Sequence, residues 1–163
     1  MNWYLKCLKN YTVFEGRARR KEFWMFQLVS SIIFLVLYFA GYALHKIIGI
    51  GVDSLIPFIV YGLYIIPPTM AVTVRRLHDI GKSGLYLLLF VVLMGLSLEL
   101  LFEIEIKFRH WKMPAILNEY YPVILVLGNL IPWVIFLGMS ALLCKDSCPK
   151  ENKYGPNPKK VEA

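Results

Sequence analysis

Four long apolar blocks, separated by polar segments, set the pattern of this chain of 163 residues. Blocks 23–44, 54–74 and 121–144 contain no charged residue, and block 85–102 contains only Glu99. At about 1.5 Å of rise per residue, each is long enough for a helix to cross a hydrocarbon core of about 30 Å. The pattern therefore predicts an all-α fold: one membrane domain that is an integral bundle of four transmembrane helices.

The polar segments at the two ends differ in character. Residues 1–22 open with a stretch whose aromatic and aliphatic residues fall on one face at helical spacing, opposite Asn and Lys. This predicts an N-terminal interfacial helix in the headgroup layer. The alternative is an ordinary amphipathic lead-in that only orients the first span. Residues 145–163 have the composition of a disordered or loosely packed tail.

The charges predict the orientation, because Lys and Arg in short loops resist translocation. The two terminal segments and the loop between the second and third blocks carry 14 Lys/Arg and six Asp/Glu, a net charge of +8. The other face, made of the remaining two loops and Glu99 near the end of block 85–102, carries four Lys/Arg and five Asp/Glu, a net charge of −1. Both termini are therefore predicted to be cytoplasmic. The same placement explains the basic composition, so nucleic acid is not an expected partner.

Prolines and polar residues inside the blocks predict local irregularities. Pro67-Pro68 lack backbone donors and should kink or break the second helix. Gly128, Asn129 and Pro132 mark another irregularity, and Asn129 is expected to hydrogen-bond to a neighbouring helix. No ionisable residue lies near the middle of a block, which argues against an ion-coupled carrier.

The segment RRLHDIGKSG, residues 75–84, is the most distinctive polar stretch. Arg75, His78 and Asp79 stand at i, i+3 and i+4, on one face of the helix that leaves the membrane. Arg19, Arg20 and Lys21 precede the first span on the same predicted side, so the two basic clusters can converge. Glu22 and Asp79 are the expected ion-pair partners for some of these cations.

Three blocks of the sequence resemble the small bacterial inner-membrane proteins grouped as domain of unknown function 805 (DUF805), among them YhaH-like proteins. The residues that carry the resemblance are Phe14, Gly16, Arg17, Arg19, Arg20, Glu22, Phe23 and Trp24; Pro68 to Val74 with Arg75, Arg76, Leu77, His78, Asp79, Ile80, Gly81, Ser83 and Gly84; and Asn152, Tyr154, Gly155, Pro156 and Pro158. The chain departs from the family pattern at Leu85, at Cys148-Pro149 and in a longer outer loop over residues 103–120. The resemblance implies a multi-pass protein of the bacterial cytoplasmic (inner) membrane, and implies no reaction.

The favoured function is a non-catalytic membrane module whose cytoplasmic-face basic cluster binds anionic lipid headgroups or an acidic partner. The candidate binding residues are Arg17, Arg19, Arg20, Arg75, Arg76, His78 and Asp79. Arginine suits this role because its planar fork grips phosphate or carboxylate with two parallel hydrogen bonds. The alternative for each arginine is that it enforces topology and pairs with Glu22 or Asp79.

Two further functions remain open. An enzyme acting on a lipid-linked phosphate would use His78 as acid or base and Asp79 to orient it, although adjacent residues on a helix point about 100° apart. A transporter or channel subunit would need a polar cavity near Asn129 and the prolines. A homo-oligomer or a membrane-protein partner is compatible with each of these. No catalytic residue, metal site or cofactor is predicted, since Cys144 and Cys148 lack a second pair at metal-binding spacing.

Overall fold

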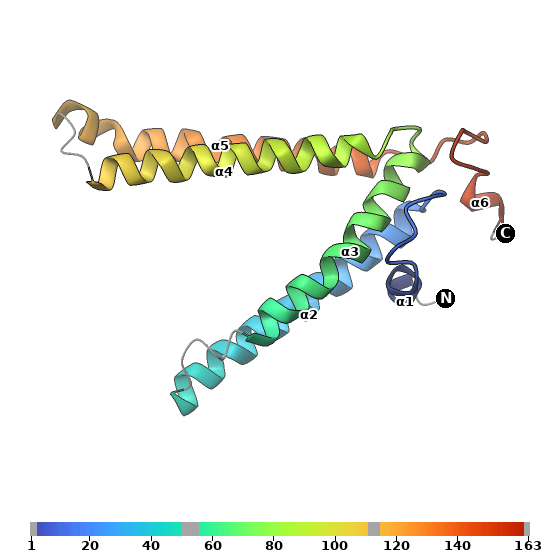
Figure 1. Ribbon diagram of the computed structural model, residues 1–163, viewed down its shortest axis with the longest axis horizontal. Coiled ribbons are helices and arrows are strands. Elements are labelled where there is room, and N and C mark those ends of the chain that lie inside the picture. Colours follow the sequence, from blue (N-terminus) through green and yellow to red (C-terminus); the bar gives the residue numbers. More distant parts are fainter. Residues whose placement is uncertain (1–2, 50–55, 111–114, 162–163) are drawn as a thin grey trace. The chain divides into compact units, whose positions relative to one another are not determined.

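Helices form the regular structure of the computed structural model, which describes residues 3–49, 56–110 and 115–161. They are α1 (Trp3–Lys9), α2 (Arg20–Ile48), α3 (Ile56–Asp79), α4 (Leu85–His110), α5 (Ala115–Cys144) and α6 (Pro158–Val161) (Figure 1). Helices α2 to α5 are long and apolar enough to cross a membrane. The predicted all-α class with four membrane-spanning helices is confirmed.

The chain divides into two compact units. The first contains residues up to Gly84 together with the tail from Asp146, and the second runs from Leu85 to Lys145. Within the first unit α2 and α3 lie side by side, and within the second α4 and α5 do so (Figure 1). Each unit is therefore built around one pair of adjacent long helices.

Aromatic side chains join α2 to α3 along the apolar part of their length. The ring of Phe34 meets the rings of Phe58 and Tyr61 edge-on, at centroid distances of 5.0 and 5.1 Å. Gly62 lies beside this ring, and a Cβ there would come within 3.4 Å of it, the limit of ordinary contact. In the second unit a Cβ on Gly128 would lie 2.6 Å from the Leu101 side chain, which would have to shift.

Most of the apolar surface of the spans is not covered by protein. Only 6% of the most apolar window of α4, and the same share of α5, is buried inside the structure. Exposed apolar area of this extent is unfavourable in water, by about 25 cal/mol per Å². The outward surface of these helices therefore requires lipid as its solvent.

Helix α3 passes through Pro67 and Pro68 without interruption, so these prolines do not break it, and the alternative of a kink stays a prediction. Thr69 and Thr73, which follow the prolines, each donate a hydroxyl hydrogen bond to the carbonyl four residues earlier, at 2.7 and 2.6 Å. Hydroxyl bonds of this kind are one way in which helices in membranes adjust around proline. Helix α3 is therefore continuous while it packs against α2.

Helix α5 is also continuous through Pro122 and Pro132. The amide of Asn129 donates to the carbonyl of Leu125 in its own helix, at 2.7 Å, so the predicted bond to a neighbouring helix is wrong. The predicted outer loop 103–120 is largely helical as well, since α4 runs to His110 and α5 begins at Ala115. Residues 111–114 of that loop, like residues 54–55 of the predicted second span, lie outside the described residues.

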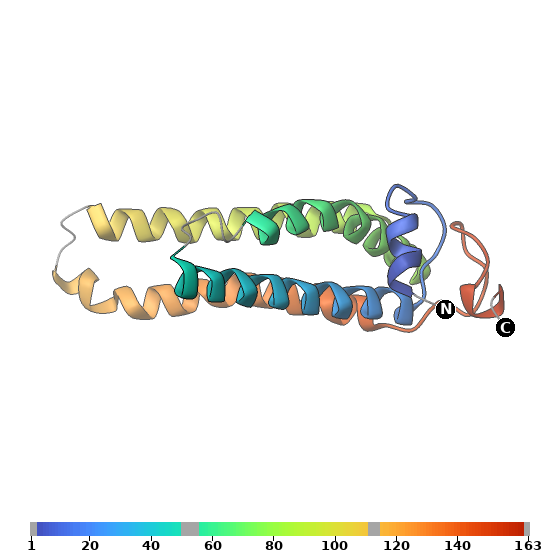
Figure 2. The same cartoon turned by 90° about the horizontal axis from the view of Figure 1, so that it is seen from below.

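The short helix α1 lies across the end of the α2–α3 pair at which α2 begins and α3 ends (Figure 2). The Tyr4 ring stacks on Phe26 with centroids 5.4 Å apart, and its hydroxyl meets that of Tyr61 at 3.2 Å. The fully buried side chains of the protein gather at this end, where they include Cys7, Phe26, Val72 and Leu77. The tightest packing is therefore at one end of the first unit.

Helix α3 ends in a glycine turn. Gly81 has φ of +76°, and its N–H donates to the carbonyl of His78 at 3.0 Å, while Lys82 N–H donates to Leu77 at 2.9 Å. This pair of bonds satisfies carbonyls that a helix end leaves open. Glycine is favoured here because a Cβ is strained in the left-handed region.

We expect Gly81→Ala to lower the free energy of unfolding by about 1 kcal/mol, the cost of placing an L-residue in the left-handed region. A Cβ at this position would meet only Cys148 Sγ at 3.7 Å, an ordinary contact, so the cost is one of backbone conformation. The measurement is the thermal unfolding midpoint of the detergent-solubilised protein. Gly95→Ala is the control, since a Cβ there meets nothing within 4 Å and alanine suits a helix better than glycine does. Equal midpoints for the two variants would contradict the expectation.

Candidate functional site

A buried carboxylate, that of Asp79, organises the end of the first unit where α2 begins and α3 ends. Arg17 Nε donates to one of its oxygens at 2.9 Å, and Arg76 and Ser147 donate to the other. Arg76 and Asp79 are fully buried, and the Arg17 side chain is 1% exposed. The three donors come from the lead to α2, from α3 and from the tail, so this one group connects three separate segments.

Arg17 holds the tail in place with the rest of its guanidinium group. Its two terminal nitrogens donate to four backbone carbonyls, those of Asp79, Cys148, Lys150 and Gly155, at 2.7 to 3.3 Å. The backbone adds to this fixation: Ala18 N–H donates to Arg75 and Cys148 N–H to Asp79, both at 3.0 Å. The predicted disordered or loosely packed tail is thus wrong for the residues that these bonds hold.

The tail folds into a compact turn that covers His78. Asn152 and Gly155 form a two-residue bridge, and the Asn152 side chain donates to the His78 carbonyl at 2.9 Å. The Tyr154 ring stacks on the His78 ring with centroids 3.7 Å apart and planes 4° from parallel. Gly155 has φ of +124°, which a side chain rarely permits. His78 therefore packs at the helix exit, with its Nδ1 3.3 Å from the Gly16 carbonyl.

A second buried carboxylate, that of Glu22, connects α1, α2 and α3. Its two oxygens meet Arg75 Nη1 at 2.8 Å and Lys6 Nζ at 3.1 Å. The thiol of Cys7 lies 3.8 Å from the first of these oxygens. Burial, together with the negative charge of Glu22, raises the pKa of Cys7 to about 12, so that the thiol stays neutral at physiological pH.

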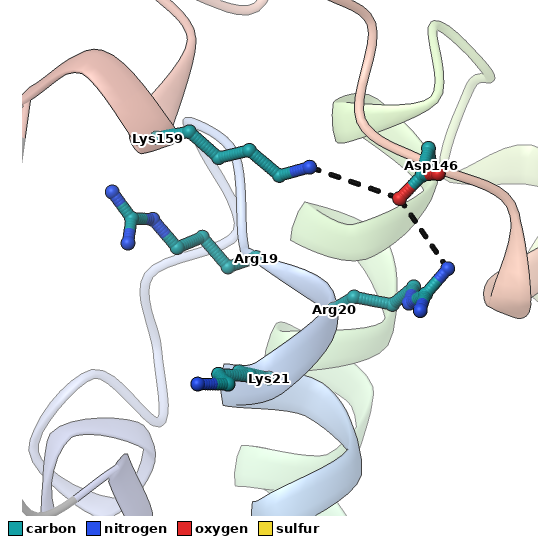
Figure 3. A pocket seen from close by; sticks show the side chains of 5 residues that line it. All are labelled: Arg19, Arg20, Lys21, Asp146 and Lys159. Carbon is teal, nitrogen blue, oxygen red and sulfur yellow. Dashed lines mark hydrogen bonds and ion pairs between the residues drawn. The ribbon is translucent and has the colours of Figure 1, made fainter.

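Four cations and one acid line an open pocket of about 430 Å³: Arg19, Arg20, Lys21, Lys159 and Asp146. Arg20 and Lys159 both reach Asp146, at 3.3 and 3.7 Å, while Arg19 and Lys21 extend away from it (Figure 3). Arg19 Nε donates to the Pro158 carbonyl at 2.9 Å, which attaches the tail to the first turn of α2. The pocket is thus formed jointly by the start of α2 and the tail.

The structure brings all three sequence blocks together and gives their residues different surroundings. Arg17, Arg75, Arg76 and Asp79 are buried in ion pairs, and His78 is packed under Tyr154. Of the seven candidate binding residues only Arg19 and Arg20 line the pocket. Phe14 and Trp24 are exposed, at 43% and 38%. Pro156 is exposed too, whereas Ser83 and Gly84 are half-buried.

Sequence reasoning missed the contribution of the tail to this site. Asp146 and Lys159 line the pocket, and Ser147 donates a hydrogen bond to Asp79. The sequence composition predicts a disordered or loosely packed tail for all three. One usable signal was the third sequence block itself, because a run such as Asn-x-Tyr-Gly-Pro contains strong turn formers rather than a uniformly flexible composition.

The arrangement does not orient an acid–base pair. Asp79 is occupied by Arg17, Arg76 and Ser147, and the Nδ1 of His78 faces a backbone carbonyl. Among the described residues, no three His, Cys, Asp or Glu side chains gather as a metal site. The chemistry that the exposed part of the site supports is electrostatic binding of an anion.

We expect Asp79→Asn to destabilise the protein by about 3 to 5 kcal/mol, because it leaves two buried arginines with an amide in place of a carboxylate. Thermal unfolding in detergent measures the effect. Asp146→Asn is the matched control: its side chain is 76% exposed, and exposed ion pairs contribute less than about 1 kcal/mol. Equal losses in the two variants would show that Asp79 does not hold the segments together.

The family described as protein of unknown function (DUF805) matches residues 11–156 of the chain. Inner membrane protein YhaH of Escherichia coli (strain K12) is 35% identical over 162 residues, 98% of each chain. Inner membrane protein YhaI of the same strain is 42% identical over 92 residues, 56% of this chain and 73% of the relative. No solved structure matches the chain. The chain therefore belongs to the DUF805 family of multi-pass inner-membrane proteins.

Proposed function

We propose that the protein is a non-catalytic membrane module that binds the phosphate of an anionic lipid headgroup in the pocket at the start of α2. The observation that carries the proposal is the pocket's lining, in which four cations, Arg19, Arg20, Lys21 and Lys159, surround one acid, Asp146. The formal charge of this set is four minus one, or +3. Such a set favours an anionic ligand.

Exposure and position support a lipid as the source of the anion. The side chains of Arg20 and Lys159 are 50% and 52% exposed, so a ligand can reach them. The pocket adjoins the first turn of a membrane-spanning helix, the level at which lipid phosphates lie. Each cation near an anionic membrane surface contributes about 1 kcal/mol, and arginine adds a planar fork that matches phosphate.

The proposal includes an orientation with both termini in the cytoplasm. The pocket and the two buried carboxylate clusters then lie on the cytoplasmic side, together with the +8 net charge of the three segments that form them. The excess of Lys and Arg on those segments supports this orientation, since such residues resist translocation.

The two alternatives lack a supporting geometry among the described residues. An enzyme that used His78 and Asp79 would need the two side chains to act together, and they have separate partners. A transporter built around Asn129 would need its amide to face a cavity, and this amide is bonded to its own helix.

We expect Arg20→Gln/Lys21→Gln to weaken the binding of phosphatidylglycerol. Two cations at about 1 kcal/mol each correspond to a loss of about 30-fold in affinity. Native mass spectrometry of the protein in neutral detergent, titrated with phosphatidylglycerol and with phosphatidylcholine, measures the binding.

The control is Lys150→Gln/Lys153→Gln, which removes two exposed cations from the same tail without touching the pocket. If the lipid binds in the pocket, this control variant should retain the wild-type affinity for phosphatidylglycerol. An equal loss in both double variants would mean that net charge, and not the pocket, attracts the lipid.

The orientation is tested by reporters fused after Ala163. Green fluorescent protein placed there should fluoresce, and alkaline phosphatase, which is active only outside the cytoplasm, should be inactive. Inserting alkaline phosphatase between α4 and α5 should give activity. The reverse pattern would overturn the proposed orientation and leave the binding result unaffected.

A further inference from the structure

Two buried arginines of the first unit differ in how completely they are bonded. Arg17 uses all three of its side-chain nitrogens, which donate to the Asp79 carboxylate and to four backbone carbonyls. Arg75 uses only Nη1, on Glu22, and its Nε and Nη2 have no hydrogen-bond partner although the residue is only 4% exposed. A buried donor without a partner is costly, and more so when the group is charged.

The two unpaired nitrogens of Arg75 share one edge of the guanidinium group. Nε–H and one N–H of Nη2 point in the same direction, as two parallel donors. This is the edge with which arginine grips both oxygens of a carboxylate or phosphate. Glu22 holds Nη1 at 2.8 Å, away from that edge, and so fixes the group while the edge stays available.

One carboxylate, that of Glu22, serves two cations beside this edge. Lys6 and Arg75 share it, which gives the three side chains a formal charge of +1. Cys7 adds no negative charge, because burial raises the pKa of its thiol to about 12. Arginine stays charged in proteins, so the surroundings of Arg75 favour an anion.

We propose that the Nε/Nη2 edge of Arg75 binds one phosphate group, enclosed at the end of the first unit where α2 begins and α3 ends. The group would accept the two parallel hydrogen bonds and neutralise the excess positive charge of Lys6, Arg75 and Glu22. A lipid headgroup and a free phosphate ion offer the same chemistry. This site goes beyond the proposed function and does not depend on it, because Arg75 does not line the pocket at Arg20 and Lys159.

Burial determines how this site behaves in solution. Arg75 is 4% exposed, whereas the side chain of Arg20 in the pocket is 50% exposed. A ligand at Arg75 must therefore exchange more slowly than one in the pocket. We expect it to remain with the protein during purification in neutral detergent.

The test is native mass spectrometry of the full chain purified in neutral detergent, comparing wild type with Arg75→Lys. Lysine preserves the charge beside Glu22 but has no two-donor edge, so retention of the bound species should fall at least tenfold. Lys150→Arg, which preserves the charge at an exposed position outside both sites, is the control and should keep it. An adduct with the mass of a phospholipid identifies a headgroup, and one with the mass of phosphoric acid identifies a free ion.

A second measurement uses wild type alone, in case Arg75→Lys does not fold. After extensive exchange into phosphate-free buffer, inorganic phosphate should raise the thermal unfolding midpoint above that in chloride at equal ionic strength, because ligands stabilise the state that binds them. If the wild-type protein retains no phosphate-bearing species and phosphate does not raise the midpoint, the proposal is wrong. The same holds if folded Arg75→Lys retains the wild-type adduct. Neither result bears on the pocket at Arg20 and Lys21, which is tested separately by Arg20→Gln/Lys21→Gln.

Discussion

Arg17 and Arg76 place their guanidinium groups on the one buried carboxylate of Asp79, and Ser147 donates to it from the tail. Removing charges from water is costly, so such a cluster is stable only when its hydrogen bonds are nearly all made. The lead to α2, the end of α3 and the tail must therefore lie together to supply the partners. The pocket depends on this constraint, since the tail that it fixes contributes Asp146 and Lys159.

The cations of this end of the protein have two distinct roles, and burial separates them. Arg17 and Arg76 are held in a closed network, where they act as structural braces. Arg20 and Lys159 meet an exposed carboxylate, and exposed ion pairs of this kind contribute little to stability. Their charges are consequently the ones available to an outside anion. Arg75 belongs to neither group, because it is buried and only partly bonded.

The two helix pairs show how far local sequence rules apply inside a membrane protein. Pro67 and Pro68 stay within a continuous α3 that packs against α2, and the hydroxyls of the threonines that follow bond to carbonyls of the same helix. Asn129 bonds to its own helix, which satisfies the amide without a neighbour. In both cases the helix continues, with side-chain hydrogen bonds to its own backbone.

The number and approximate extent of the spans follow from the amino-acid sequence alone, because the length and apolarity needed to cross a bilayer are local properties. That Glu22 and Asp79 each form ion pairs with nearby cations was also predictable from the charges in the sequence. Which cation pairs with each acid, and that the bonded part of the tail is ordered, became clear from the three-dimensional contacts. The same contacts place Arg20, rather than Arg17, at the pocket. These outcomes depend on contacts between segments far apart in the sequence, such as Arg17 with Asp79 and with Gly155, and such contacts leave no periodic pattern in the chain.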